Sequence, residues 1–537
     1  MGRIVKPSLQ QKEVDMEKLC QKKIGSAFFF HARRTPDKQA IWCEGKVASY
    51  QELAQLICRW SNAMRERGVK RGDHIGVILP NSIEFVALIL VAADLGAVLV
   101  PLNTSLTRSA VHRAFEATDV KHVVSTAALL KNLLVPNTEI DFSILDFSIA
   151  DGLWLSVDDA IDGATLLADL LQGVSPDAQP VNAAFEGDAL ILTMTSGSTG
   201  DPKPIILSQR TKFNRAIAAV ALYGITEKDK ILAATPLYHS LAERLVLIPL
   251  LIGATSVLMS KFTATIWLQS VAEQAVTFTI AVSSQLKQIA EELGDETHIY
   301  NIASLRSIVS SSALLDHHVK SDLLEKFDCE FHECYGASEI AIASNMNGVI
   351  NKIQLRSVGI AAPDVDIKII GKNDEILANG DAGEIICKTP MLFDGYFKRP
   401  DLTQAAMRGE YFRTGDIGKL DEFGFLYYLG RTKDIIISGG INIYPTDIET
   451  VVNSHISVIE SAAFAFPDER LGEIIAIAVV PFNKSEFDLK LLRFYCCNHL
   501  ADFQQPRKFF IIDSLPKNSM GKLLKFELIK MFTTNTF

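Results

Sequence analysis

A segment rich in hydroxyl groups and glycine has the composition of an anion-binding loop. It contains Thr195, Ser196, Gly197, Ser198, Thr199 and Gly200, and Asp201, Pro202 and Lys203 follow. Two glycines allow backbone N–H groups to turn toward an anion, the hydroxyl groups add donors, and Lys203 supplies a positive charge suited to phosphate. The GK[ST] ending of a Walker A loop is missing, and residues 204–208 predict a strand rather than a helix. A flexible Ser/Gly hairpin is the alternative interpretation.

Five further polar motifs follow in the second half of the chain. They begin with Tyr335-Gly336-Ala337-Ser338-Glu339 and Tyr411-Phe412-Arg413-Thr414-Gly415-Asp416, and continue with residues 430–434, 438–445 and 516–522. A carboxylate such as Glu339 is a ligand that Mg²⁺ uses, and an acceptor-only side chain such as Asp416 suits two ribose hydroxyl groups. Taken alone, Tyr335 is typical of a core residue, and the segment around Asp416 is typical of a polar turn.

Together, the ordered motifs resemble the adenylate-forming superfamily, which includes acyl-CoA synthetases, peptide-synthetase adenylation domains and luciferases. The resemblance spans residues 195–522 and favours the acyl-CoA synthetase branch. It implies that ATP and Mg²⁺ activate a fatty or aryl carboxylic acid to an acyl-adenylate with release of pyrophosphate, and that coenzyme A then takes the acyl group. The alternatives are an enzyme that loads a carrier-protein phosphopantetheine, a fatty-acyl-AMP ligase, and a nucleotide-binding regulator without catalysis. The uninterrupted spacing from Asp416 to Gly440 disfavours the second, and the intact Lys203, Glu339, Asp416 and Lys522 disfavour the third.

The resemblance also assigns roles to individual residues. It implies catalytic roles for Lys522, Glu339, Thr195 and His239, with Glu339 as the metal ligand. Ser338 stands where the family usually has threonine. Lys433 matches the hinge about which a small C-terminal domain turns, and Gly439 and Gly440 match the lining of the thiol tunnel. The implied ATP and AMP contacts are Thr195, Ser196, Gly197, Ser198, Thr199, Lys203, Ser312, Ala313, Glu333, Cys334, Tyr335, Gly336, Ser338, Asp416, Arg431 and Lys522.

The acyl site is expected at the segment 235–240. By resemblance, His239, Ser240, Ser311 and Gly336 border it. Relatives that activate amino acids carry aspartate where this chain has Ser240, which argues against α-amino acids as substrates. Glu243, about one helical turn further on, is expected to pair with Arg244 or Arg210. The sequence does not define the length or aromaticity of the acid.

Length and composition limit the remaining choices. A chain of 537 residues is long enough for two to four domains. Its net charge of −10 argues against a broad nucleic-acid surface. The eight cysteines are scattered without zinc spacing, no signal peptide is apparent, and the apolar stretch 85–100 is too short for a membrane span, so we expect a cytoplasmic protein. We expect a monomer or a homodimer.

The elements that must position these residues alternate between short apolar strands and helices up to about residue 370, which predicts an α/β fold with mostly parallel sheets. A strand at 74–80, a helix at 82–96 and a capping box at Ser49 and Glu52 are examples. Residues 151–187 are expected to connect elements, and 360–428 to form a small antiparallel barrel. We therefore predict a large domain over 1–431 and a small, mobile α+β domain over 432–537.

Overall fold

The computed structural model describes residues 22–134, 152–196, 202–294, 300–315, 317–351, 354–518 and 521–533. These residues form two compact units. The first contains the chain up to Thr195 together with Pro204–Ser260, and the second contains Ser196–Lys203 and the chain from Lys261 onward. No helix in the described ranges is long and apolar enough to cross a membrane.

The first unit contains a seven-stranded sheet with the order β7-β6-β5-β3-β4-β8-β9. Neighbouring strands from β7 to β8 run parallel, which confirms the prediction of mostly parallel pairing. The segment expected only to connect elements also contributes β6, β7 and α6 (Leu167–Leu170), which its irregular composition did not indicate. The strands are β3 (His74–Ile78), β4 (Val98–Pro101), β5 (Val120–Ser125), β6 (Trp154–Ser156), β7 (Thr165–Leu166), β8 (Ala189–Ser196) and β9 (Pro202–Ser208).

Two helices of this unit show how local sequence determines local structure. Helix α2 (Tyr50–Glu66) begins with the predicted capping box: the Glu52 N–H donates to Ser49 Oγ at 3.2 Å, and the Ser49 N–H donates to Glu52 Oε2 at 2.7 Å. Helix α3 (Ile83–Leu95) is buried from Phe85 onward and ends at Gly96 in the left-handed conformation, as expected for a buried helix that leads into β4.

A second set of strands in the first unit runs in the order β10-β11-β1-β2. The pairs β10–β11 and β1–β11 are parallel, and β1–β2 is antiparallel. Helix α8 follows β10 and is buried from Ala242 to Ile252. The strands are β1 (Gln39–Cys43), β2 (Lys46–Ser49), β10 (Lys230–Ala233) and β11 (Thr255–Leu258), and the further helices are α1 (Ile24–Arg34), α4 (Arg108–Ala117), α5 (Ala127–Leu134), α7 (Gln209–Leu222) and α8 (Ser240–Ile252).

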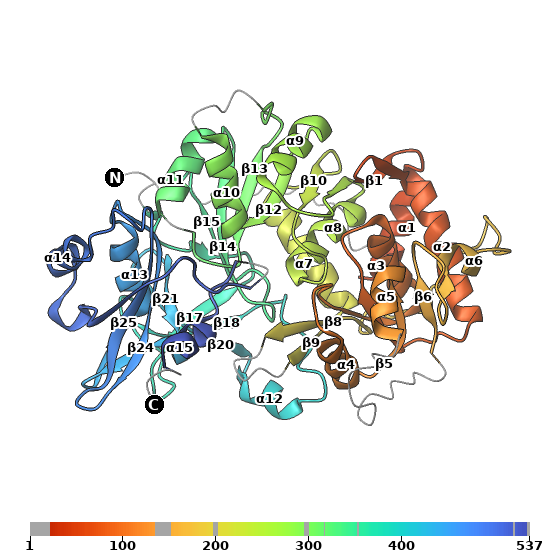
Figure 1. Ribbon diagram of the computed structural model, residues 1–537. Coiled ribbons are helices and arrows are strands. Elements are labelled where there is room, and N and C mark those ends of the chain that lie inside the picture. The colour runs from red at the N-terminus through yellow and green to blue at the C-terminus, as the bar shows by residue number, and fades with distance from the viewer. Residues whose placement is uncertain are drawn as a thin grey trace. The chain divides into compact units, whose positions relative to one another are not determined.

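The second unit begins with parallel strands β12 (Phe278–Val282), β13 (Ser307–Ser311) and β14 (Glu330–Tyr335). Two antiparallel strands, β15 (Ser344–Asn347) and β16 (Ile360–Ala361), extend them. Helices α9 (Ala264–Gln274), α10 (Ser283–Leu293) and α11 (His317–Lys326) lie beside these strands (Figure 1).

The region predicted to be a small antiparallel barrel forms a five-stranded antiparallel sheet. The turns between its strands bring the end of β21 back beside Asp416 on β20, where Asp416 pairs with Arg431 in the ladder. Its elements are β17 (Asp366–Ile370), β18 (Gly383–Lys388), α12 (Pro400–Ala405), β19 (Met407–Arg408), β20 (Tyr411–Leu420) and β21 (Leu426–Arg431).

The C-terminal segment is α+β, as predicted. One face of its sheet, with Ile475 and Ile477, packs with residues of α13 and α14, and the other face, with Ala476 and Ala478, packs with α15. The division at 431/432 remains a prediction, because this segment belongs to the second unit. Its elements are β22 (Ile436–Ser438), β23 (Ile441–Ile443), α13 (Pro445–Asn453), β24 (Val458–Asp468), β25 (Gly472–Pro481), α14 (Leu489–His499), β26 (Lys508–Ile511) and α15 (Lys525–Thr533).

Candidate active site

Three of the predicted nucleotide contacts meet in the second unit. Tyr335 ends β14, and its hydroxyl group donates to Asp416 Oδ2 at 2.7 Å. Asp416 is only 2% exposed, and its Oδ1 lies 2.8 Å from Nε of Arg431. That oxygen receives no well-aligned hydrogen bond from the described residues. Burial raises the pKa of Asp416, although Arg431 and the Tyr335 hydroxyl oppose this rise. The site therefore holds a buried carboxylate with unused acceptor capacity beside an aromatic ring.

Lys522, near the C-terminal end of the described residues, lies within electrostatic range of the same carboxylate. The residue is exposed. Partial loss of hydration lowers its pKa, and the nearby cations Arg431 and Lys433 lower it further, whereas Asp416 and Asp434 oppose them. The fold thus brings the lysine of the C-terminal loop within electrostatic range of the predicted nucleotide contacts.

The loop that carries Lys522 packs beside the segment 312–313. A Cβ on Gly521 would lie 2.3 Å from the Ser284 hydroxyl at the start of α10, so only glycine allows this approach. Next to Ser284, the Ser283 hydroxyl donates to the carbonyl oxygen of Ala313 at 2.5 Å. Ser312, at the end of β13, has a φ of 78° and is exposed. These contacts gather Ser312, Ala313 and the Lys522 loop around the start of α10.

Glu333 has a buried structural partner. Its carboxylate forms an ion pair with Lys320 of α11, and its Oε1 accepts from the Leu315 N–H at 3.1 Å. Lys320 also donates to the Leu355 carbonyl oxygen at 2.8 Å. Burial raises the pKa of Glu333, and Lys320 opposes that rise. Nucleotide contact by Glu333 remains a prediction, because its side chain is already engaged in these bonds. Its neighbour Cys334 is also buried, and nucleotide contact by this residue likewise remains a prediction.

The turn after Tyr335 places the predicted metal ligand. Glu339 is half-buried, and its Oε1 accepts from the Tyr396 hydroxyl at 3.0 Å. Burial and the carboxylate beside it raise the pKa of Tyr396, which therefore stays a neutral donor. Ser338 and Gly336 are exposed. A Cβ on Gly336 would lie 1.7 Å from the carbonyl oxygen of Ala341, so this turn requires glycine.

The predicted phosphate loop is described only at its edges. Strand β8 leads into it and β9 leaves it, which confirms the strand predicted over 204–208. Lys203, on β9, is half-buried. Gly197, Ser198 and Thr199 lie outside the described residues, and the side chains of Thr195 and Ser196 are likewise not described. Their roles remain predictions.

The segment expected to border the acyl site is held in the first unit by Asn81, which the sequence analysis did not identify. Asn81 is 6% exposed, and its Nδ2 donates to the carbonyl oxygens of Thr235 at 2.8 Å and Met259 at 2.9 Å. Its Oδ1 accepts from the Leu237 N–H at 2.7 Å. This arrangement fixes the backbone just before His239 at three points.

His239 immediately precedes helix α8, and Ser240 is the first residue of that helix. The imidazole ring lies 4.5 Å, between centroids, from the ring of Tyr238. Burial lowers the pKa of His239 to about 4, so the ring is neutral near pH 7. Ser311, the remaining predicted acyl contact, is half-buried at the end of β13.

The expected partners of Glu243 were wrong. Its Oε2 lies 2.5 Å from Nζ of Lys212 on α7, and both side chains are buried. Arg210 instead lies 3.8 Å from Glu186 on the surface. Lys212 is on the buried face of α7, where that helix packs against α8, whereas Arg210, two residues earlier, is exposed on a different face. A sequence alone does not specify which helix faces meet.

The predicted hinge and tunnel residues are exposed in the second unit. Lys433 lies in a short 3₁₀ helix, Thr432–Asp434, directly after β21. Gly439 and Gly440 form the turn between β22 and β23, with φ angles of 56° and 84° that favour glycine. A movable hinge and a thiol tunnel remain predictions.

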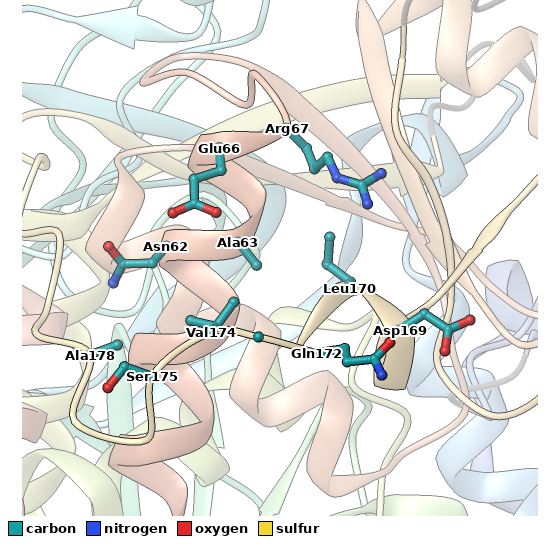
Figure 2. Close-up of a pocket in the computed structure, with 11 residues that line it drawn as sticks. Asn62, Ala63, Glu66, Arg67, Asp169, Leu170, Gln172, Val174, Ser175 and Ala178 are labelled. Atoms are coloured by element: carbon teal, nitrogen blue, oxygen red, sulfur yellow. The ribbon is translucent and has the colours of Figure 1, made fainter.

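A surface hollow of about 400 Å³ lies elsewhere, beside α2 and α6 of the first unit (Figure 2). Asn62, Glu66 and Arg67 of α2 and Asp169 of α6 are among its lining residues. None of the predicted site residues lines it. Because its walls lack those residues, we do not assign the hollow to the chemistry.

Comparison with known proteins supports the assignment drawn from the motifs. The model of the AMP-binding enzyme family matches residues 28–397, and that of the AMP-binding enzyme C-terminal domain matches residues 447–522. The long-chain-fatty-acid–CoA ligase FadD13 of Mycobacterium tuberculosis is 29% identical over 494 residues, which cover 90% of this chain and 93% of that ligase. The 2-succinylbenzoate–CoA ligase of Bacillus cereus is also 29% identical, over 92% of this chain and 95% of that protein.

Among solved structures, ATP-bound MatB from Rhodopseudomonas palustris aligns with a TM-score of 0.84 and 26% identity, over 96% of this chain and 99% of MatB. The fold and the sequence therefore lead to the same group of proteins. The chain belongs to the AMP-binding enzyme family, within its group of AMP-forming acid–CoA ligases.

Proposed function

We propose that this chain activates a fatty or aryl carboxylic acid with ATP and then transfers the acyl group to coenzyme A. In the first step, a carboxylate oxygen of the acid attacks the α-phosphorus of ATP, and pyrophosphate leaves. In the second, the CoA sulfur attacks the acyl carbon, and AMP leaves with the bonding electrons. The observation that carries this proposal is the meeting of Tyr335, Asp416, Arg431 and Lys522.

This cluster suits the nucleoside part of ATP. The Tyr335 ring offers a stacking surface, and Asp416 Oδ1 has acceptor capacity that a ribose hydroxyl group would use. Arg431, which lies 2.8 Å from that carboxylate, would hold the same ribose, as the resemblance implies. The phosphates would extend toward Lys203 and the hydroxyl-rich loop, whose N–H groups and side chains donate to phosphate oxygens.

The metal and the C-terminal lysine would neutralise charge during adenylation. Glu339 fits a Mg²⁺ ligand, because its carboxylate is half-buried and already oriented by Tyr396. Bound Mg²⁺ would offset the charge of the phosphates. Lys522 would bridge the acid carboxylate and the phosphate oxygens. Desolvation and the neighbouring cations Arg431 and Lys433 lower its pKa below the ordinary lysine value.

The acid would lie against His239, Ser240, Ser311 and Gly336. A neutral Ser240 gives an α-ammonium group no buried counter-charge, so a free amino acid loses binding energy. We therefore propose that deamino acids are better substrates than the matching amino acids. We retain the proposal of a cytoplasmic monomer or homodimer.

A screen of free acids for pyrophosphate release, with and without coenzyme A, tests the proposal. We expect release that requires ATP, Mg²⁺ and an acid, and thioester formation only with coenzyme A. Turnover after complete removal of divalent metal would contradict the role of Glu339. Adenylate formation without thioester, rescued by a phosphopantetheinylated carrier protein, would instead support the carrier-loading alternative.

The two half-reactions can be separated with two variants. Lys522→Ala should slow pyrophosphate formation by at least about 10²-fold and spare thioester formation from a supplied acyl-adenylate. Lys433→Pro should impair the second half-reaction more, because proline restricts φ at the proposed hinge. If both variants damage both half-reactions equally, the two steps use one fixed arrangement and the hinge proposal is wrong.

A further inference from the structure

Arg244 is a buried cation for which the described residues provide no anion. The residue is only 7% exposed, and its Nε is buried without a hydrogen bond. No ion pair or hydrogen bond found among the described residues involves its side chain. Arginine is almost never buried without a partner, because the desolvation of an unpaired charge costs several kcal/mol.

The carboxylate next to it in the sequence does not fill this role. Glu243 and Arg244 are the only charged residues of α8, and Glu243 Oε2 lies 2.5 Å from Lys212 on α7. Burial lowers the pKa of Lys212, and the nearby cations Arg215 and Arg244 lower it further. Glu243 has the opposite effect and raises this pKa. The carboxylate of Glu243 thus lies near more than one cation, and it pairs with Lys212 and not with Arg244.

The position of Arg244 on its helix relates it to the acyl site. Ser240 and Arg244 are separated by four residues, so their side chains lie on the same face of α8, one turn apart. Both are near the N-terminal end of the helix, where the macrodipole disfavours a cation and favours an anion. The side chain of His239, which precedes the helix, makes no capping bond there. A bound anion would therefore satisfy the arginine and the helix end together.

We infer that Arg244 binds a second anionic group of the acid, so that the enzyme acts on dicarboxylic acids. This inference rests on the proposed function, because it takes the site at Ser240 as the acyl site. One carboxylate of the substrate is activated, and the other pairs with the guanidinium group one helical turn deeper. A monocarboxylic acid of the same length leaves Arg244 unpaired and binds less tightly.

The binding of a second carboxylate by Arg244 is tested with diacids and monoacids of equal length and with variants at position 244. Adipic and suberic acids are compared with hexanoic and octanoic acids by kcat/KM for pyrophosphate release in the wild type, Arg244→Leu, Arg244→Lys and Arg210→Leu. Arg210→Leu is the control, because it removes an exposed cation of α7 that lies 3.8 Å from Glu186. We expect the wild type and the control to prefer the diacids by at least about tenfold, Arg244→Leu to lose that preference, and Arg244→Lys to keep part of it.

Three results would overturn the inference. The first is a wild type that uses diacids no better than monoacids, and the second is an unchanged preference in folded Arg244→Leu. The third is a rise in KM for ATP alone, because the anion would then be a nucleotide phosphate. If Arg244→Leu does not fold, the comparison of wild type with Arg244→Lys decides.

Failure of the proposed function is recognised separately, as an absence of pyrophosphate with every acid. In that case, the shift in melting temperature on addition of an acid shows whether Arg244 binds a second carboxylate. Suberic acid alone should raise the melting temperature in the wild type and the control more than in Arg244→Lys, and octanoic acid should not. An equal shift with both acids would overturn the inference.

Discussion

Replacing Gly336 with alanine tests whether the turn after Tyr335 forms a wall of the active site. The new Cβ would lie 1.7 Å from the carbonyl oxygen of Ala341, whereas ordinary contact begins at 3.4 Å, so the two backbones must separate by 1.7 Å. The turn resists this movement, because the Ala341 N–H donates to the Ala337 carbonyl oxygen and the Ala343 N–H to the Tyr335 carbonyl oxygen, both at 2.8 Å. A displacement of this size at a positioned group lowers catalysis by about 10²-fold.

The assay is kcat/KM for acid-dependent pyrophosphate release, together with the Kd for ATP by calorimetry. Gly187→Ala is the control, because its Cβ would meet nothing within 4 Å and its φ is not positive. We expect the control to match the wild type, and Gly336→Ala to lose both ATP affinity and turnover while its far-UV circular dichroism is retained. Wild-type kinetics in Gly336→Ala would refute the reasoning, since the turn would then either relax freely or lie away from the site.

Three further predictions concern charges. Because partial burial and neighbouring cations lower the pKa of Lys522, the alkaline limb of pyrophosphate release should begin below 10.5, and Lys433→Gln should move that limb to higher pH in a pH–rate profile. His239 has a folded pKa of about 4 against 6.5 ordinarily, so the unfolded chain binds the proton first as pH falls. Stability should therefore decline from pH 6.5 toward 4, less steeply in His239→Gln, as urea unfolding at several pH values would detect. Lys212→Met should lower the free energy of unfolding by about 3–5 kcal/mol, and Lys212→Met with Glu243→Leu by less, because the single change strands a buried carboxylate; equal urea midpoints for the two variants would contradict this.

Local sequence determined much of what could be predicted. The capping box at Ser49 and Glu52, and the helix that ends at Gly96, depend on residues a few positions apart, so the sequence contains the whole interaction. The same holds for the strand after the hydroxyl-rich loop and for the antiparallel strands around Asp416, whose turn residues are close together. The resemblance supplied roles for these residues, but no distances between them.

Contacts between distant segments could not be predicted in this way. Tyr335 and Asp416 each had a role, yet their mutual hydrogen bond joins strands of two different sheets. The pair of Glu243 with Lys212 depends on how α7 crosses α8, and the sequence analysis expected Arg244 or Arg210 instead. The ion pair of Lys320 with Glu333 could not be predicted from the sequence, because a lysine in a charged helix is typically at the surface.

The way in which Asn81 holds the segment proposed to border the acyl site bears on how substrate specificity could change during evolution. The three hydrogen bonds that Asn81 makes with described residues go to main-chain atoms, at residues 235, 237 and 259. An anchor that contacts only the backbone is indifferent to the side chains attached to it. Tyr238 and His239 are thus free to vary in size and polarity while the loop keeps its path. If this segment borders the acyl site as proposed, a lineage can exchange one acid for another by single substitutions while the backbone of the segment keeps its course.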